Sequence, residues 1–110
     1  MVSPSAGSVV LVTFPFSDLS ASKSRPAVVL ASSGRGDWIL CQVTSSSYED
    51  PNAIKITDKD FISGSLLRIS FARPGKLFTA NISIIISEVG ILHPPVLESL
   101  RKAVINILSG

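Results

Sequence analysis

Few side chains in this sequence are suited to acid, base or charge-stabilising chemistry. His93 is the only histidine and Cys41 the only cysteine, which excludes a mechanism with two histidines and a cysteine-based metal site. The sequence has no glycine-rich phosphate loop and no Ser/His/Asp set. An active site in this chain would therefore be built from arginine, lysine, threonine, serine and carboxylate side chains.

Three arginines are candidates for binding an anion. Arg25 precedes Pro26 and Arg73 precedes Pro74, and a residue before proline is held extended because the proline ring disfavours helical backbone there. Arg68 is expected to point away from the apolar face of its strand. A guanidinium group binds an anion through paired N–H donors. A solvated arginine at the rim of a sheet explains each position equally well.

Other polar positions have a structural and a functional interpretation. Asp58 and Asp60 could be half of a metal site, but no third ligand is nearby in sequence, so capping of a short helical turn is favoured. His93 stands before Pro94, where we expect a junction residue. Thr44 to Ser47 reads T-S-S-S, which also suits a strand end that continues into a loop.

Composition indicates one compact domain. The chain has 110 residues, of which 45% are hydrophobic and 16% charged, so it can close a core and is not disordered. The low charged fraction leaves apolar surface that a second copy could bury. The net charge of +2 is too small to prove an anionic partner, and the basic residues between positions 23 and 73 form either a basic face or ordinary solvated charge.

Targeting signals are not evident. A single cysteine fits a reducing compartment. The N-terminal residues do not resemble a secretory signal, and no apolar run reaches the roughly 18 residues that a membrane span needs. We therefore expect a soluble, cytoplasmic protein.

The first half of the chain is predicted to be strands and loops. Pro15 ends the first strand and Gly34 and Gly36 form a turn between the second and third. The strands are predicted at 8–14, 26–32, 37–45 and 53–57, and the polar loops at 17–25 and 45–52.

The second half is predicted to be two strands and two helices. Residues 66–72 alternate, with Leu67, Ile69 and Phe71 on the buried face and Arg68 and Ser70 on the other. A turn at 72–76 and a short strand at 77–80 should follow. The closely spaced apolar residues of 81–92, which end near Gly90, predict a short buried helix. From Pro94 a 3.6-residue repeat predicts a C-terminal helix. Strands followed by a helix indicate a mainly β (α+β) small barrel.

Together these segments resemble the PemK/MazF toxin family. The resemblance rests on Gly7 to Val12 followed by Phe14-Pro15-Phe16, on Arg25 to Leu30, on Gln42 to Ser45, and on Ser70 to Thr79. It covers nearly the whole chain. The Arg-Pro block together with the later Thr-Ser strand end is its most specific part.

The resemblance implies an SH3-like barrel and an mRNA interferase, which is a toxin endoribonuclease that cleaves single-stranded RNA without a metal ion or cofactor. The products would carry 2′,3′-cyclic phosphate and 5′-hydroxyl ends. It implies that Arg25 binds the scissile phosphate, that Thr44 is its catalytic partner, and that Arg73 is a general acid or charge stabiliser. Residues implied in RNA binding are Lys23, Ser45, Tyr48, Arg68 and Lys76, although Tyr48 also suits an exposed loop.

The family's partners are implied in the same way. They are a cognate antitoxin, a second copy of the chain, and operator DNA, which is bound only as a complex with the antitoxin.

Two departures from the family pattern keep alternatives open. Gly75 stands where some members have the aspartate that pairs with the arginine equivalent to Arg73, so the identity of the general base stays open. Ser8 stands where an acidic residue is common, in a position that we expect to be structural. A degenerate member that only binds RNA or antitoxin is one alternative. A gyrase-poisoning toxin of the same fold is another, but it needs a C-terminal aromatic residue and this chain ends in Ile107-Leu108-Ser109-Gly110.

Overall fold

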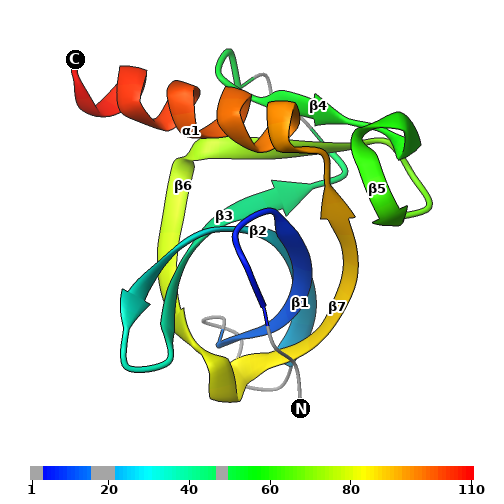
Figure 1. The fold of residues 1–110 in the computed structure, drawn as a ribbon, viewed down its shortest axis with the longest axis vertical. Helices are drawn as coiled ribbons and strands as arrows, with labels where there is room; N and C mark the ends of the chain where they lie inside the picture. Colours follow the sequence, from blue (N-terminus) through cyan, green and yellow to red (C-terminus); the bar gives the residue numbers. More distant parts are fainter. Residues whose placement is uncertain (1–3, 16–21, 47–49) are drawn as a thin grey trace.

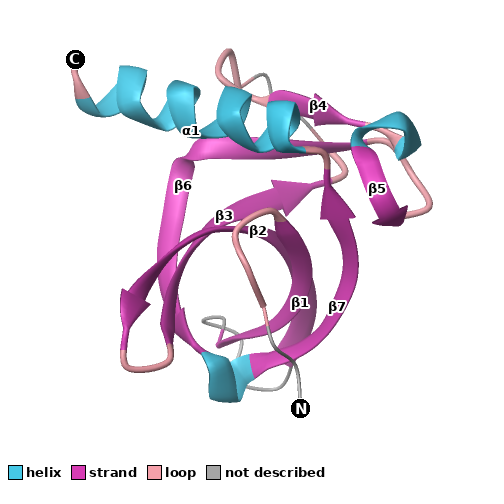
Figure 2. Cartoon of the chain, in the orientation of Figure 1, coloured by secondary structure: helices cyan, strands magenta, loops and turns pink. Residues whose placement is uncertain are grey.

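A computed structural model describes residues 4–15, 22–46 and 50–110 of the chain. Within these ranges seven strands form one antiparallel sheet, and an α-helix follows at the C-terminal end (Figures 1 and 2). The elements in chain order are β1 (Ser8–Pro15), β2 (Ser22–Gly34), β3 (Asp37–Thr44), β4 (Ile54–Ile56), the 3-10 turn η1 (Asp58–Asp60), β5 (Phe61–Gly64), β6 (Ser70–Asn81), the 3-10 turn η2 (Ile82–Ile84), β7 (Ile85–Leu92) and α1 (Pro94–Leu108).

The sheet is curled into a half-barrel. Its strand order is β4-β6-β3-β2-β1-β7-β5, and Figure 1 shows β1, β2, β3, β6 and β7 arranged as a ring with α1 lying along the first part of β6. The mainly β small-barrel prediction and the C-terminal helix are confirmed. Leu97, Leu100 and Val104 are the buried face of α1.

Both faces of the central strands are buried. Val9, Val28 and Cys41 pack with α1 in one hydrophobic cluster, while their neighbours Val10 and Val29 belong to a second cluster. A strand that is buried on both faces has no polar side, so it reads as a continuous apolar run. This explains why β1 and β2 lack the alternation of a half-exposed strand.

The β2–β3 hairpin has the predicted turn. Gly34, Arg35 and Gly36 all have positive φ angles, of 95°, 57° and 80°, which glycine adopts without the steric cost of a Cβ atom. The strand before this turn is longer than predicted. It begins at Ser22, paired with Pro15, so the predicted loop at 17–25 extends too far, and residues 16–21 lie outside the described residues.

The helix predicted for 81–92 is wrong. This segment forms η2 and the strand β7, in which Ile85 packs into one cluster and Leu92 into the other. Unlike β1, this strand is only partly buried, since Ile86 is exposed, and two register irregularities in its pairing with β1 interrupt the alternation that identifies a strand. Gly90 is not a helix stop. A Cβ atom there would lie 2.6 Å from the Phe61 ring, so the glycine allows β5 and β7 to pair closely.

The predicted strand at 66–72 and turn at 72–76 also need correction. Residues 65–69 are irregular, Leu67 has a φ angle of 64° and is 90% exposed, and β6 begins only at Ser70. The faces are reversed, because Ser70 and Ala72 are buried and larger side chains from β4 and α1 fill the core beside them. Residues 72–80 belong to one strand, which bends sharply in Figure 1.

Candidate functional site

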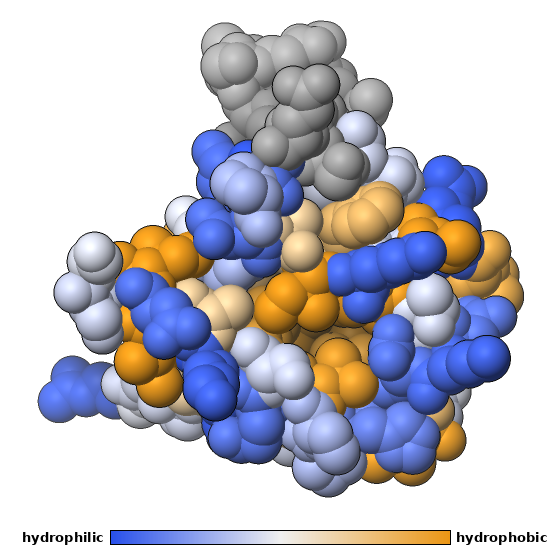
Figure 3. All heavy atoms as spheres, turned by 90° about the horizontal axis from the view of Figure 1, so that it is seen from above, coloured by the Kyte–Doolittle hydropathy of each residue, from blue (hydrophilic) through white to orange (hydrophobic). Residues whose placement is uncertain are grey.

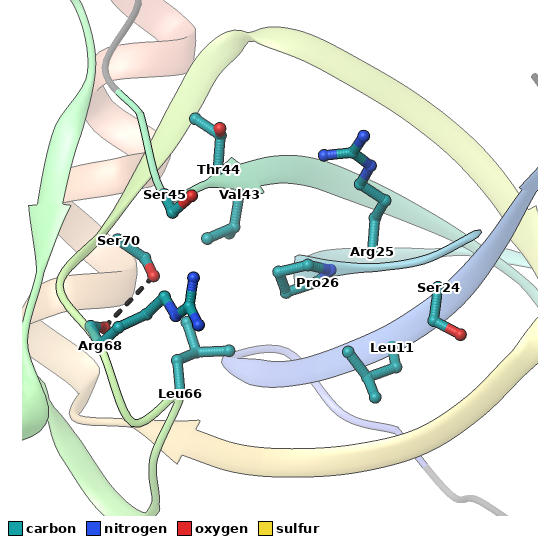
Figure 4. Close-up of a pocket in the computed structure, with 10 residues that line it drawn as sticks. All are labelled: Leu11, Ser24, Arg25, Pro26, Val43, Thr44, Ser45, Leu66, Arg68 and Ser70. Atoms are coloured by element: carbon teal, nitrogen blue, oxygen red, sulfur yellow. Dashed lines mark hydrogen bonds between the residues drawn. The ribbon is translucent and has the colours of Figure 1, made fainter.

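Arg25 and Thr44 lie together at the open end of the β2–β3 hairpin. The ladder pairs Ala27 with Gln42, and two residues further along each strand this register leads to Arg25 and Thr44. Side chains two residues apart in a strand share a face. Figure 4 shows both side chains pointing to the same side of the strands, away from Leu11 and Leu66.

A hollow of about 390 Å³ opens beside this strand end. Arg25, Thr44 and Ser45 border it together with Arg68, which comes from the irregular segment 65–69 (Figure 4). Four of the predicted site residues therefore meet around one hollow. The rest of its lining is mostly apolar or small and consists of Leu11, Ser24, Pro26, Val43, Leu66 and Ser70.

Thr44 and Ser45 differ in their surroundings. Thr44 is the last residue of β3 and is only 7% exposed, and its hydroxyl oxygen accepts a hydrogen bond of 3.2 Å from the Ser46 backbone N–H. Ser45 is exposed. The backbone bond orients the Thr44 hydroxyl, which supports the assignment of Thr44 as the better-positioned of the two.

Arg73 lies nearby but does not line the hollow. The register between β3 and β6 changes from Val43↔Ala72 to Cys41↔Leu77, so residues 73–76 form a bulge opposite a single residue of β3. The Nε atom of Arg73 donates to Oδ2 of Asp50 over 2.9 Å. This hydrogen bond lowers the pKa of the Asp50 carboxyl, aided by its bond from the Asn52 backbone N–H.

The one cysteine supports this bulge. The Cys41 thiol is fully buried and donates to the Arg73 carbonyl oxygen over 3.1 Å. Burial raises the pKa of the thiol to about 12, so it stays protonated at neutral pH. Because the thiolate is the nucleophilic form of cysteine, Cys41 is suited to a packing role.

Of the other predicted RNA-binding residues, one lies on the bulge and two have side chains that the structure does not describe. Lys76 is exposed on the bulge, beside a smaller hollow of about 160 Å³ that it shares with Gln42, Leu77 and Phe78. Lys23 pairs with Phe14 through the backbone, and the structure does not describe its side chain. Tyr48 lies outside the described residues.

Sequence reasoning missed two polar partners of the predicted residues. Asp50 was read only as part of a polar loop, and the D-P-N motif indicates a turn there without indicating a partner for Arg73. Ser8 is fully buried and donates to Oε2 of Glu88 over 2.6 Å, a contact between strands that no local pattern indicates.

Among the described residues, no group of three or more His, Cys, Asp or Glu side chains is arranged to hold a metal ion. Asp60 accepts a 2.7 Å bond from the Thr57 backbone N–H and so takes part in the capping box of η1. The turn was expected after Asp60, at Phe61 and Ile62, but it consists of Asp58–Asp60 itself, and Phe61 begins β5. Asp58 accepts a hydrogen bond from the Ser65 hydroxyl. His93 is exposed at the N-cap of α1, in the junction position that was expected.

This arrangement suits an anionic, extended ligand. Two guanidinium groups and a hydroxyl approach one end of the sheet, where arginine can offer paired N–H donors to a phosphate. The fold and this site define a small curled β protein with an arginine-bordered hollow at one end of its sheet.

Comparison with known proteins identifies the family. The sequence model of the PemK-like, MazF-like toxins of type II toxin–antitoxin systems matches residues 5–108, so the chain belongs to this family. No curated protein sequence matches the chain. Among the described residues, no helix is long and apolar enough to cross a membrane.

Solved structures with the same fold are distant in sequence. One is a MazE–MazF structure from Deinococcus radiodurans, with a TM-score of 0.76, 20% identity and 96% of each chain covered. Another is an endoribonuclease in complex with its cognate antitoxin from a mycobacterial species, with a TM-score of 0.72 and 14% identity over 97% of this chain and 96% of that chain. A third is the Mycobacterium tuberculosis toxin MazF-mt6, with a TM-score of 0.71 and 15% identity over 93% and 96% of the two chains.

Proposed function

We propose that this chain is a toxin endoribonuclease that cleaves single-stranded RNA without a metal ion. The observation that carries the proposal is the meeting of Arg25 and Thr44 at one strand end beside an open hollow, in a chain of the PemK/MazF family. Unpaired RNA is the favoured substrate because its bases can splay over a sheet surface while the phosphates are bound.

The chemistry is an internal attack within the RNA. The 2′-oxygen, once deprotonated, bonds to the adjacent phosphorus, and the bond to the 5′-oxygen breaks as that oxygen takes up a proton. The products are a 2′,3′-cyclic phosphate and a 5′-hydroxyl. Arg25 stabilises the added negative charge on the phosphate oxygens, Thr44 donates a hydrogen bond beside it, and Arg73 stabilises charge or protonates the leaving oxygen.

Three macromolecular partners belong to the proposal. One is a cognate antitoxin, which is present in two of the similar structures. Another is operator DNA, bound only with the antitoxin. The third is a second copy of the chain, supported by large apolar side chains that are exposed on a single copy, such as Ile105 and Leu108 on α1. Figure 3 shows apolar surface interspersed with polar surface on one such face. The proposed location is the cytoplasm.

Product analysis tests the reaction. The purified chain should cut a mixed-sequence, single-stranded RNA equally well with and without EDTA, and the fragments should carry cyclic phosphate and 5′-hydroxyl ends. Arg25→Ala is the inactive control. Fragments with 5′-phosphates, or activity lost in EDTA, would require a metal-assisted mechanism instead. Binding without cleavage would favour the degenerate member of the family.

The oligomeric state has its own test. Sedimentation velocity at micromolar concentration should give a dimer. A monomer at this concentration would contradict an active site that is shared between two copies.

A further inference from the structure

Asp50 is a carboxylate held in place between β3 and β4. Its Oδ2 atom accepts from Arg73 Nε over 2.9 Å, and its Oδ1 atom accepts from the Asn52 backbone N–H over 2.9 Å. Its backbone carbonyl accepts from the Ala53 N–H over 3.2 Å. The side chains of Asp50 and Arg73 are only 11% and 21% exposed. A carboxylate bound through both oxygens and its backbone has little freedom to move.

The bulge constrains the backbone of Arg73. The Cys41 thiol binds its carbonyl oxygen over 3.1 Å, and Pro74 is fully buried. The bond from Nε to Asp50 then orients the whole guanidinium plane, because Nε lies in that plane. Backbone and side chain are therefore both constrained.

Arg73 lies two residues beyond the β6 residue that pairs with Thr44. Thr44 pairs directly with Phe71, and the regular register ends after Ala72, where the bulge begins. Two residues along a strand span about 7 Å, a separation that a long arginine side chain can bridge.

We propose that Asp50 is a positioning residue that holds the Arg73 guanidinium toward RNA bound beside Arg25 and Thr44. This inference rests on the proposed function. Asp50 would supply, from a different segment, the carboxylate partner that Gly75 does not provide. Its role is to orient Arg73 and not to accept a proton, because the bond from Arg73 stabilises the charged carboxylate and makes it a weaker base.

A double-mutant cycle tests whether Asp50 acts through Arg73. Asp50→Asn keeps the size of the side chain but removes its charge, and we expect single-turnover cleavage of a short RNA to slow about tenfold, a usual coupling between neighbours in contact. Asp50→Glu should recover part of the rate. In an Arg73→Ala background, Asp50→Asn should have no further effect, which a general loss of folding would not reproduce.

Asp37→Asn is the matched control. Asp37 also accepts a 2.9 Å bond from a side-chain N–H, that of Asn81, but it lies at the opposite end of β3 from Thr44. Its replacement should leave the cleavage rate unchanged. A thermal melt of each variant checks its folding. The ¹⁵N NMR signal of the Arg73 Nε–H group should be recorded as well, because faster exchange of this proton with solvent in Asp50→Asn reports the broken pair independently of activity.

The outcomes separate this inference from the proposed function. If the parent cleaves and Asp50→Asn cleaves at the same rate, or if the effects of Asp50→Asn and Arg73→Ala are additive, Asp50 is not a positioning residue. If the parent cleaves no RNA, the proposed nuclease function fails. Fluorescence anisotropy with the same RNA then decides the role of Asp50: weaker binding by Asp50→Asn but not by Asp37→Asn supports it, and equal binding overturns it.

Discussion

The hairpin and the β6 bulge hold their arginines by different means. In the hairpin, Arg25 and Thr44 lie two residues beyond the Ala27–Gln42 pair of a backbone ladder, which starts at the turn with Gly34 and Gly36 and contains two register irregularities before Ala27. In the bulge the ladder is interrupted, and Arg73 is held by contacts with Asp50 and Cys41.

The difference indicates what each region should tolerate. Placement by a ladder depends on backbone conformation and turn geometry, whereas placement at a bulge depends on individual side-chain partners. Changes in glycine conformation should therefore affect the hairpin, and changes in charge should affect the bulge.

The largest effect is expected at Arg25. Arg25→Ala should slow single-turnover cleavage about 100-fold or more, the usual scale for deleting one preorganised oxyanion donor. Arg25→Lys should also lose much of the activity, because lysine keeps the charge but not the two parallel N–H bonds. The unfolding free energy should change by no more than about 0.5 kcal/mol, as for most substitutions outside the core.

Lys102→Ala, an exposed change on α1, is the control for loss of positive charge alone. If Arg25→Ala cleaves RNA as fast as the parent and its thermal melt is unchanged, Arg25 is only a rim residue and its assignment to the active site is wrong.

A matched pair of glycine substitutions compares the two regions directly. Gly36 in the hairpin turn has a φ angle of 80°, so Gly36→Ala should destabilise the fold by about 1–2 kcal/mol, the cost of left-handed backbone for an L-residue. Gly75 in the bulge has no positive φ angle, and a Cβ atom there would approach nothing closer than 3.9 Å. Gly75→Ala should therefore stay within about 0.5 kcal/mol of the parent.

Urea unfolding at neutral pH measures both variants. Equal destabilisation by the two would contradict the view that only the hairpin depends on glycine conformation.

The smallest effect concerns the acid dependence of the bulge. The pKa of Asp50 is lowered from its ordinary value of 3.8, chiefly by the hydrogen bond from Arg73, with Lys76 also contributing. A carboxyl with a lowered folded-state pKa adds stability above its unfolded-state pKa and loses it as pH falls through the folded value. Parent and Asp50→Asn should thus differ at pH 7 and converge below pH 3.8.

Urea titrations at pH 7, 5 and 3 follow this convergence, with Asp37→Asn beside them for comparison. A difference between parent and Asp50→Asn that persisted unchanged at pH 3 would show that the charge of Asp50 is not its source.

The sequence alone was sufficient for the hairpin, the C-terminal helix and the family resemblance. Turn glycines, the Arg-Pro block and the helical repeat are local patterns, and each depends on residues that are close together along the chain. From them Arg25 and Thr44 could be selected as site residues, and the structure brings these two together with Ser45 and Arg68 around one hollow.

Only the tertiary structure decided β7, the start of β6 and the partner of Arg73. Residues 85–92 form a strand because they pair with β1 on one side and β5 on the other, although Ile86 stays exposed. Leu67 is exposed because the chain there is irregular and not part of a strand. Asp50 meets Arg73 because β4 pairs with β6. These outcomes depend on contacts between residues far apart in sequence, for which no local pattern carries a signal.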